Sequence, residues 1–233
     1  MSPILETLHP RKIVAHVVDA VWPARCAGCG HRGTWVCDEC RPKITLLSPP
    51  WCERCGIPND SHCRCFELSP AIANARAAAV YSGWMRRAIQ LMKYENEPAR
   101  IPGLAEMMAP LALGLPDFDA LVPMPLHGSR RRRRGYNQAE LLAVHLGAHI
   151  NRPVSRCLTR TRLTRQQVGL DAESRRQNVA GAFGAAPAVD ISGQRLLLID
   201  DVMTTGSSLN ACAEVLRAAG AAWVGTLTLA REI

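Results

Sequence analysis

Eight of the ten cysteines in this chain lie between residues 24 and 66, where they form a duplicated unit. The first unit consists of Cys26, Cys29, Cys37 and Cys40. The second unit follows at an offset of 26 residues and consists of Cys52, Cys55, Cys63 and Cys65. A segment this short, with three aromatic residues, cannot bury enough apolar surface to fold alone. Cross-links between the cysteines must therefore stabilise it.

The N-terminal sequence favours metal ligation over disulfide bonds as the cross-link. Glu6 precedes the first basic residue and no apolar stretch there ends in a small-residue cleavage site, so we expect a cytoplasmic protein with reduced thiols. Paired cysteines in such a protein commonly bind zinc, and four thiolates complete a tetrahedral structural site. We expect one or two structural zinc ions. Because Cys63 and Cys65 are one residue closer than the matching pair Cys37 and Cys40, sequential and interleaved metal sites both remain open.

The chain as a whole has the composition of a folded protein without membrane insertion. Hydrophobic residues make up 48% and charged residues 21%, which is enough apolar sequence for a core. The longest uncharged stretch, residues 218–230, is shorter than the roughly 18 apolar residues that a membrane span requires. Ile13, Val17 and Val21 recur at helical spacing and predict an N-terminal helix within residues 1–23.

From residue 74 onward, strand patterns alternate with helical patterns. Strands are expected at residues 76–82, 119–123, 195–199 and 223–229. Helices are expected at residues 84–94, 102–109 (ended by Pro110), 137–150 and 208–219. The third helix places Leu141, Val144 and His145 in register on one face, and residues 158–177 are expected to form a long loop or a frayed helix. This alternation predicts an α/β domain with a mostly parallel sheet and flanking helices.

The strand at 195–199 leads into a segment that combines carboxylates with hydroxyl groups. Its members are Asp200, Asp201, Thr204, Thr205, Gly206, Ser207 and Ser208. Glycine lets the backbone approach a ligand, and the hydroxyls lie beside the free N–H groups of a helix N-terminus, which favours phosphate. The two carboxylates would repel a phosphate, but they can accept hydrogen bonds from vicinal hydroxyls or hold Mg²⁺. The segment therefore predicts a ligand that carries both a phosphate and a cis-diol sugar.

This segment resembles the signature with which type I phosphoribosyltransferases bind 5-phosphoribosyl-1-pyrophosphate (PRPP). The resemblance implies that Asp200 and Asp201 bind the ribose 2- and 3-hydroxyls and that the loop from Thr204 to Ser208 wraps the 5-phosphate. It also implies magnesium bound together with PRPP. The alternative structural interpretation is an ordinary strand-to-helix turn capped by Ser and Thr.

Five consecutive arginines occupy residues 130–134, shortly after the strand expected at 119–123. In α/β sheets this is the end at which ligands bind. On a loop, the arginines could neutralise a pyrophosphate or a nucleic-acid backbone, in keeping with the net charge of +8. The alternative is a solvated surface that binds nothing.

The sequence around this run resembles the ComF family of competence-related proteins. The basic positions of that family fall on Arg130, Arg132 and Arg134, and its R-G-[FY]-N-Q motif continues through Gly135, Asn137 and Gln138. We expect contacts with pyrophosphate or DNA from Arg130, Arg132, Arg134, Asn137 and Gln138. Residues 158–183 resemble the following loop and the N-x-x-G-A-F element of the family, except that Arg165 and Gln166 replace the usual Pro-Pro.

The ComF resemblance covers nearly all of residues 20–230. It implies a double zinc ribbon at residues 24–66, a type I phosphoribosyltransferase-like domain at residues 72–233 and a role in DNA uptake during natural transformation. The partners that it implies are PRPP or another phosphoribosyl ligand, single-stranded DNA, and DNA-uptake or helicase proteins.

Three functions are therefore open: a PRPP-binding accessory protein of DNA uptake, an active phosphoribosyltransferase of nucleotide metabolism, and a single-stranded DNA-binding module. No residue stands out in the sequence as a general base or a nucleophile, so no catalytic residue is assigned. We favour the first function because ligand binding follows more directly from these motifs than turnover does.

Overall fold

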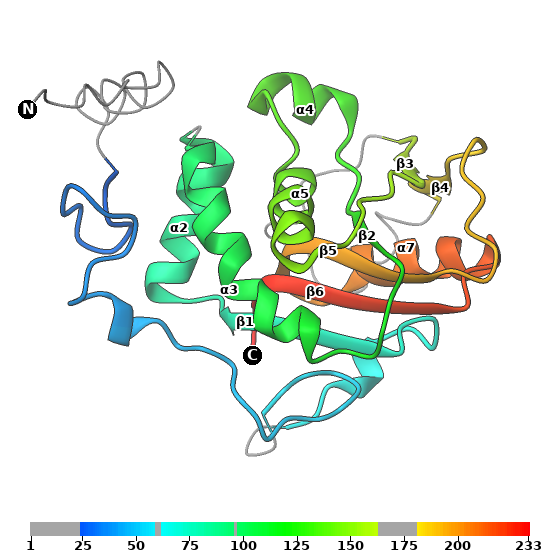
Figure 1. Cartoon of the computed structure of the whole chain (residues 1–233), viewed down its shortest axis with the longest axis horizontal. Helices are drawn as coiled ribbons and strands as arrows, with labels where there is room; N and C mark the ends of the chain where they lie inside the picture. Colours follow the sequence, from blue (N-terminus) through cyan, green and yellow to red (C-terminus); the bar gives the residue numbers. More distant parts are fainter. Residues whose placement is uncertain (1–23, 59–61, 96, 163–180) are drawn as a thin grey trace, which may run out of the picture.

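The computed structural model describes residues 24–58, 62–95, 97–162 and 181–233. The helix expected within residues 1–23 and the departure at Arg165 and Gln166 lie outside these residues. Within the described residues, helices cover both faces of a four-stranded sheet, and the cysteine-rich segment runs beside the edge strand β1 (Figure 1).

The sheet is parallel throughout and has the strand order β1-β6-β5-β2. Its strands are β1 (Asn74–Val80), β2 (Ala120–Pro123), β5 (Arg195–Met203) and β6 (Trp223–Arg231). Every residue of β6 is buried, as expected for a central strand with helices on both faces. The predicted α/β architecture with a parallel sheet is confirmed.

Four helices form the two outer layers. They are α2 (Gly83–Tyr94), α3 (Ile101–Leu113), α5 (Gln138–Ile150) and α7 (Ser207–Ala218). Helices α2, α3 and α5 share a core with alternate residues of β5 and β6, including Leu197 and Leu227. Helix α7 packs on the opposite face, against Leu196, Leu198 and Val224. Two short 3-10 helices, η1 (Arg41–Lys43) and η2 (Cys65–Glu67), lie in the cysteine-rich segment, and η3 (Pro98–Arg100) precedes α3.

Two helix predictions were wrong in detail. Pro110 does not end α3, because a proline in the last turn removes only its own N–H while its carbonyl still accepts from Gly114, 3.1 Å away. In α5, Val144 is 41% exposed and His145 is also exposed, whereas Leu142 and Leu146 are buried with small residues between them. Apolar residues lie on both faces of α5. The face that carries Leu142 and Leu146 also has more small residues, and this face lies against the sheet.

Two segments expected to be loops form regular structure. Residues 158–160 begin the expected loop but form β3 (Leu158–Arg160), which pairs antiparallel with β4 (Phe183–Ala185). The arginine run lies in helix α4 (Gly128–Arg134), not on a loop. The His127 side chain caps α4 by accepting from the Ser129 N–H, and Gly135 ends it in the left-handed conformation at φ 79°.

Among the described helices, none has the length and apolarity needed to cross a bilayer.

Candidate functional site

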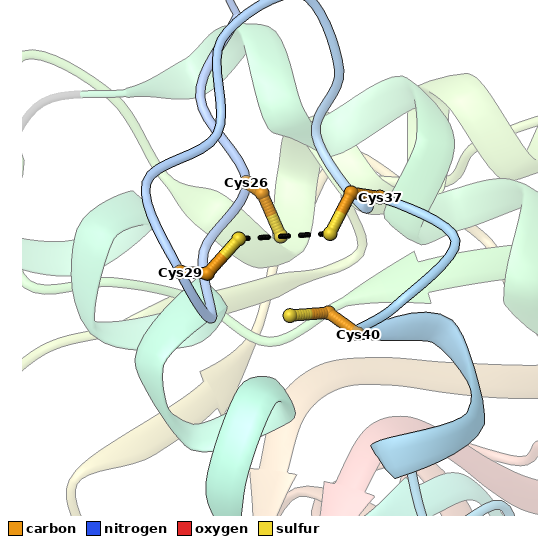
Figure 2. A group of neighbouring side chains, drawn as sticks. All are labelled: Cys26, Cys29, Cys37 and Cys40. Carbon is orange, nitrogen blue, oxygen red and sulfur yellow. Dashed lines mark hydrogen bonds between the residues drawn. The ribbon is translucent and has the colours of Figure 1, made fainter.

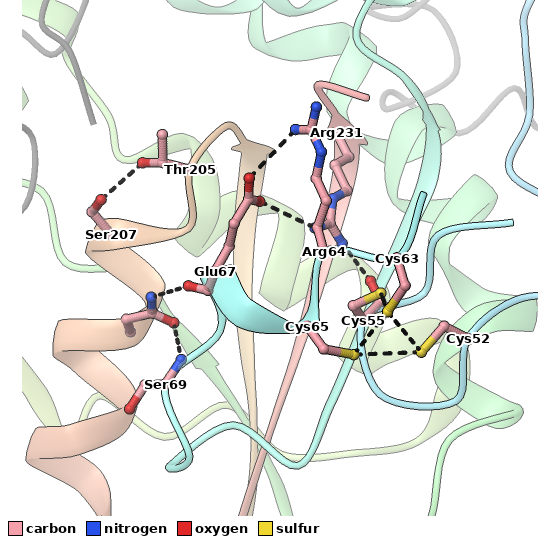
Figure 3. A network of polar contacts seen from close by, with 11 residues as sticks. Cys52, Cys55, Cys63, Arg64, Cys65, Glu67, Ser69, Thr205, Ser207 and Arg231 are labelled. Carbon is pink, nitrogen blue, oxygen red and sulfur yellow. Dashed lines mark hydrogen bonds and ion pairs between the residues drawn. The ribbon is translucent and has the colours of Figure 1, made fainter. Parts of the chain in front are cut away.

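The eight cysteines form two groups of four that follow the order of the sequence. The first cluster is Cys26, Cys29, Cys37 and Cys40, and the second cluster is Cys52, Cys55, Cys63 and Cys65. Within each cluster all sulfur atoms lie within 4.8 Å of one another (Figures 2 and 3). This geometry fits one tetrahedral zinc ion per cluster and resolves the open question in favour of sequential sites.

Local hydrogen bonds prepare part of each cluster for metal. Hydrogen bonds from the backbone of Cys55 outweigh burial and lower the pKa of Cys52 to about 6. Burial disfavours the Cys26 thiolate, but backbone hydrogen bonds around it, led by that of Cys37, lower its pKa to about 5. The thiolate is the form that ligates zinc, so these contacts favour ligation by Cys26 and Cys52, whereas burial raises the pKa of Cys40 and Cys65 to about 12. With four sulfur ligands, each zinc would have no open position for water, so its role would be structural.

The acidic pair lies at the carboxyl end of β5, and it is bound to a lysine from another element. The Asp201 carboxylate is 2.7 Å from the Lys93 Nζ in the last turn of α2, and the Asp201 residue is only 7% exposed. Burial disfavours the charged lysine, but the charges of Asp201 and Asp200 outweigh burial and raise its pKa. The sequence patterns did not indicate Lys93 as a residue of the site, although it is one of only three lysines in an arginine-rich chain.

The Asp200 carboxyl group has an environment of its own. Burial and the neighbouring Asp201 raise the pKa of Asp200 to about 7, although Lys93 opposes the shift. An Asp200 carboxylate oxygen also accepts a hydrogen bond from the Asp201 N–H at 2.8 Å. Asp201 thus forms an ion pair with Lys93, whereas the pKa of Asp200 lies near neutral pH.

The loop after β5 is shaped by one glycine. Gly206 has φ 71° and is the N-cap of α7, and a Cβ at this position would lie 2.9 Å from the Met203 Cε. Thr204 and Ser208 are partly buried, and the hydroxyls of Thr205 and Ser207 lie 2.8 Å apart. The predicted loop residues thus surround the N-terminus of a 12-residue helix, a geometry that suits an anion.

The arginine helix does not place its members on one face. Arg130 and Arg134 are partly buried, whereas Arg131, Arg132 and Arg133 are exposed. Arg134 donates to the Gln138 Oε1 at 3.0 Å and lies over the Tyr94 ring at 5.3 Å. Asn137 donates to the Met124 carbonyl at 3.0 Å. Asn137 and Gln138 therefore hold α4 and the start of α5 in position.

A further cation, Arg160 of β3, was missed from the sequence because this strand was expected to be a loop. Burial and the charge of Arg130 lower the pKa of Arg160, and the charge of Asp200 opposes the shift. Arg160 is therefore electrostatically coupled to both the arginine helix and the acidic pair. The sequence around Arg160 gave little indication of a strand, because β3 forms only by pairing with the distant residues 183–185.

The two cysteines outside the clusters, Cys157 and Cys212, are buried free thiols. Cys157 is 1% exposed and Cys212 is fully buried. Burial raises the pKa of both thiols, so neither has the character of a reactive cysteine.

Comparison with known protein families agrees with this architecture. Residues 17–69 match the double zinc ribbon domain, and residues 133–233 match the phosphoribosyl transferase domain. Together with the parallel sheet and the two cysteine clusters, these matches define a protein in which a double zinc ribbon precedes a phosphoribosyltransferase-type domain.

Two relatives extend the match to most of the chain. Competence protein F of Haemophilus influenzae is 33% identical over 208 residues, which cover 84% of this chain and 90% of that protein. DNA utilization protein YhgH of Escherichia coli is 30% identical over 215 residues, which cover 88% of this chain and 92% of that protein. The chain belongs to the ComF family, the family of competence protein F, as the sequence resemblance predicted.

A solved structure with some likeness is the glutamine PRPP amidotransferase from B. subtilis, complexed with ADP and GMP. Its TM-score is 0.40 at 18% sequence identity. The likeness covers 56% of this chain and 26% of that chain.

Proposed function

We propose that this protein binds PRPP at the carboxyl end of β5 and acts as a PRPP-dependent accessory protein of DNA uptake. The observation that carries the proposal is the junction of Asp200 and Asp201 with the left-handed turn at Gly206 and the N-terminus of α7. In this arrangement the carboxyl groups accept hydrogen bonds from the ribose hydroxyls. The residues from Thr204 to Ser208 receive the 5-phosphate.

The cations around the acidic pair support the proposal on electrostatic grounds. Lys93 neutralises Asp201, which lowers the repulsion that two adjacent carboxylates would exert on a polyphosphate ligand. Arg130 and Arg160 add positive charge from α4 and β3, which suits the pyrophosphate group. Arg132 and Arg134 complete the proposed set on α4, and magnesium would accompany the pyrophosphate and supply further positive charge.

The biological role in the proposal comes from the relatives. One is named a competence protein and another a DNA utilization protein, and both match this chain over most of their length. We propose the same process, uptake and use of DNA, for this chain, with DNA-uptake or helicase proteins as its partners.

Calorimetric titration of PRPP, with and without Mg²⁺, tests the ligand. Asp200→Asn combined with Asp201→Asn should weaken binding at least about 100-fold, because each carboxylate loses charge-assisted hydrogen bonds worth about 1.5–3 kcal/mol. Asparagine is chosen over alanine because it keeps the shape around the partly buried Lys93. Asp117→Asn, at an exposed carboxylate paired with Arg152, is the matched control and should leave affinity unchanged. Equal affinity in the double variant and the wild type would overturn the diol-binding role, and pyrophosphate release under the same conditions would indicate an active transferase.

A second candidate function is single-stranded DNA binding by α4. Arg131, Arg132 and Arg133 are exposed on this helix, and the Tyr94 ring beside it is 59% exposed, which offers cations together with a stacking surface. The logarithm of DNA affinity should then fall with the logarithm of salt concentration by about 0.7 for each neutralised phosphate. Arg131→Gln with Arg133→Gln should reduce this slope and leave PRPP affinity unchanged, and a flat salt dependence in the wild type would exclude this function.

A further inference from the structure

Residues 67–69 follow shortly after Cys65, the last cysteine of the second cluster, and are hydrogen-bonded to the first turn of α7. The Asn210 side chain donates to the Glu67 carbonyl at 2.7 Å and accepts from the Ser69 N–H at 3.0 Å. The Asn210 backbone N–H in turn donates to the Gly206 carbonyl at 2.8 Å. One asparagine therefore connects the exit of the second cluster, through its side chain, to the glycine that shapes the phosphate loop, through its backbone N–H.

An apolar contact reinforces this connection. Leu68 is 5% exposed, and its Cδ2 atom is 3.9 Å from the position that a Cβ on Gly206 would take. Figure 3 shows Glu67 and Ser69 between Cys65 and the turn that carries Thr205 and Ser207. The segment 67–69 thus packs directly against the outside of the loop.

A buried arginine links the same cluster to the strand end before the loop. Arg231, the last residue of β6, is 1% exposed and pairs in register with Met203. Its guanidinium donates to the Cys55 carbonyl, and its Nη2 lies 3.7 Å from the Glu67 Oε2. Four thiolates with one Zn²⁺ carry a net charge of about −2, which would compensate this buried cation.

The first cluster has a different attachment and gives a built-in comparison. Cys26 and Cys40 are buried in the same core as Trp84, which lies in the first turn of α2, whereas Lys93 lies in the last turn. Nine residues of helix, about 13 Å, separate these two positions. The first cluster therefore meets α2 at the end of the helix opposite to Lys93, the residue that contacts Asp201.

We propose that the second zinc cluster positions the phosphate loop, with Asn210 as the positioning residue, so that zinc retention at this cluster and ligand binding at the loop stabilise each other. The proposal rests on the proposed function, because it takes PRPP as the ligand. Zinc fixes the turn that holds Cys63 and Cys65, this turn fixes residues 67–69, and these residues hold Gly206 through Asn210. Because such coupling is reciprocal, PRPP must raise the zinc affinity by the factor by which zinc raises the PRPP affinity.

Equilibrium competition for zinc tests the coupling on the full chain. The protein is titrated with a zinc-selective chelator, with and without saturating PRPP and Mg²⁺, and the retained zinc is measured per chain. PRPP should raise the chelator concentration that removes one of the two ions by about tenfold, within the usual range for linked sites, and should leave the other ion unaffected. In Asn210→Ala this protection should fall below about twofold, and PRPP affinity should fall about tenfold, because the side-chain hydrogen bonds to residues 67–69 are lost.

Asn74→Ala is the matched control. It also removes a hydrogen bond from an asparagine side chain to the second cluster, from Asn74 Nδ2 to the Glu53 carbonyl at 2.9 Å, but on the β1 side. PRPP should protect zinc in this variant as in the wild type. Loss of protection in both variants would mean general destabilisation and would overturn the role of Asn210. PRPP binding without any protection of zinc would overturn the coupling alone, whereas absence of PRPP binding in the wild type would overturn both the coupling and the proposed ligand.

Discussion

The two cysteine clusters come from one repeated sequence pattern, yet they contact the rest of the protein in different ways. The first cluster packs through side chains, with Cys26 and Cys40 in the core beside Trp84 of α2. The second cluster is attached through its backbone: the Ala75 N–H of β1 donates to the Arg54 carbonyl at 2.7 Å, and Arg231 of β6 donates to the Cys55 carbonyl. The same repeated cysteine pattern therefore makes side-chain contacts with α2 in the first cluster and backbone contacts with β1 and β6 in the second cluster.

The largest expected difference between the clusters concerns two equivalent glycines. Gly30 and Gly56 follow the C-x-x-C pair of each cluster and have φ 77° and 70°. A Cβ on Gly30 meets nothing within 4 Å, whereas a Cβ on Gly56 would lie 2.3 Å from the Ala75 carbonyl oxygen of β1. Gly30→Ala should cost about 1–2 kcal/mol for the left-handed backbone, and Gly56→Ala about 3 kcal/mol or more because overpacking adds to this strain.

Urea unfolding of the zinc-loaded variants measures both glycine effects. The wild type and the two variants are compared at equal zinc content, so that differences in unfolding free energy report the backbone contact and not metal loss. Equal destabilisation by the two substitutions would contradict the tighter backbone attachment of the second cluster.

An intermediate difference is expected for two buried arginines that each stack on a tryptophan of a cluster. Arg76 lies 5.1 Å from the Trp51 ring and also donates to the Glu53 carbonyl at 2.9 Å, whereas Arg100 lies 4.6 Å from the Trp35 ring. Arg76→Met should therefore lower the unfolding free energy by about 2 kcal/mol and Arg100→Met by about 1 kcal/mol, since the first also loses a hydrogen bond to the cluster. Thermal melting followed by circular dichroism gives the order, and the reverse order would show that stacking outweighs the backbone contact.

The smallest effect is expected at Phe66, whose side chain is 84% exposed although it lies within η2 of the second cluster. Phe66→Ala should change the unfolding free energy by less than about 0.5 kcal/mol and leave PRPP affinity unchanged, because the contacts to α7 come from the backbone on either side of Leu68. Chemical denaturation and calorimetry check the two quantities. A tenfold loss of PRPP affinity would mean that the Phe66 side chain itself contributes to the ligand site.

The sheet and α7 could be predicted because their information is local. The strands expected at 195–199 and 223–229 lie within β5 and β6, and the helix expected at 208–219 is α7, whose apolar residues at helical spacing, Leu209, Cys212, Ala213 and Leu216, are all buried. The loop at 204–208 could be located for the same reason, since strand, glycine turn and helix are contiguous in the sequence. Its assignment to PRPP remains a prediction.

The missed features depend on contacts between distant residues. Lys93 meets Asp201 from a different helix, and Arg160 belongs to a strand that exists only because residues 183–185 pair with it. Helix α4 was missed because a histidine, His127, caps it in place of the usual Ser, Thr, Asp or Asn. The pairing of the cysteines was likewise undecidable from spacing, because either order satisfies the same ligand count.

The strand order gives the synthesis of this protein a particular timing. The sheet reads β1-β6-β5-β2, so β6 lies between the first strand of the sheet and β5. Until β6 (Trp223–Arg231) has been synthesised, β1 lacks the strand with which it pairs in the described residues, and Arg231 is not available to the Cys55 carbonyl. The cysteine clusters precede all four strands of the sheet in the chain, so the sheet against which they pack is completed only when β6 is inserted between β1 and β5, after those two strands have been made.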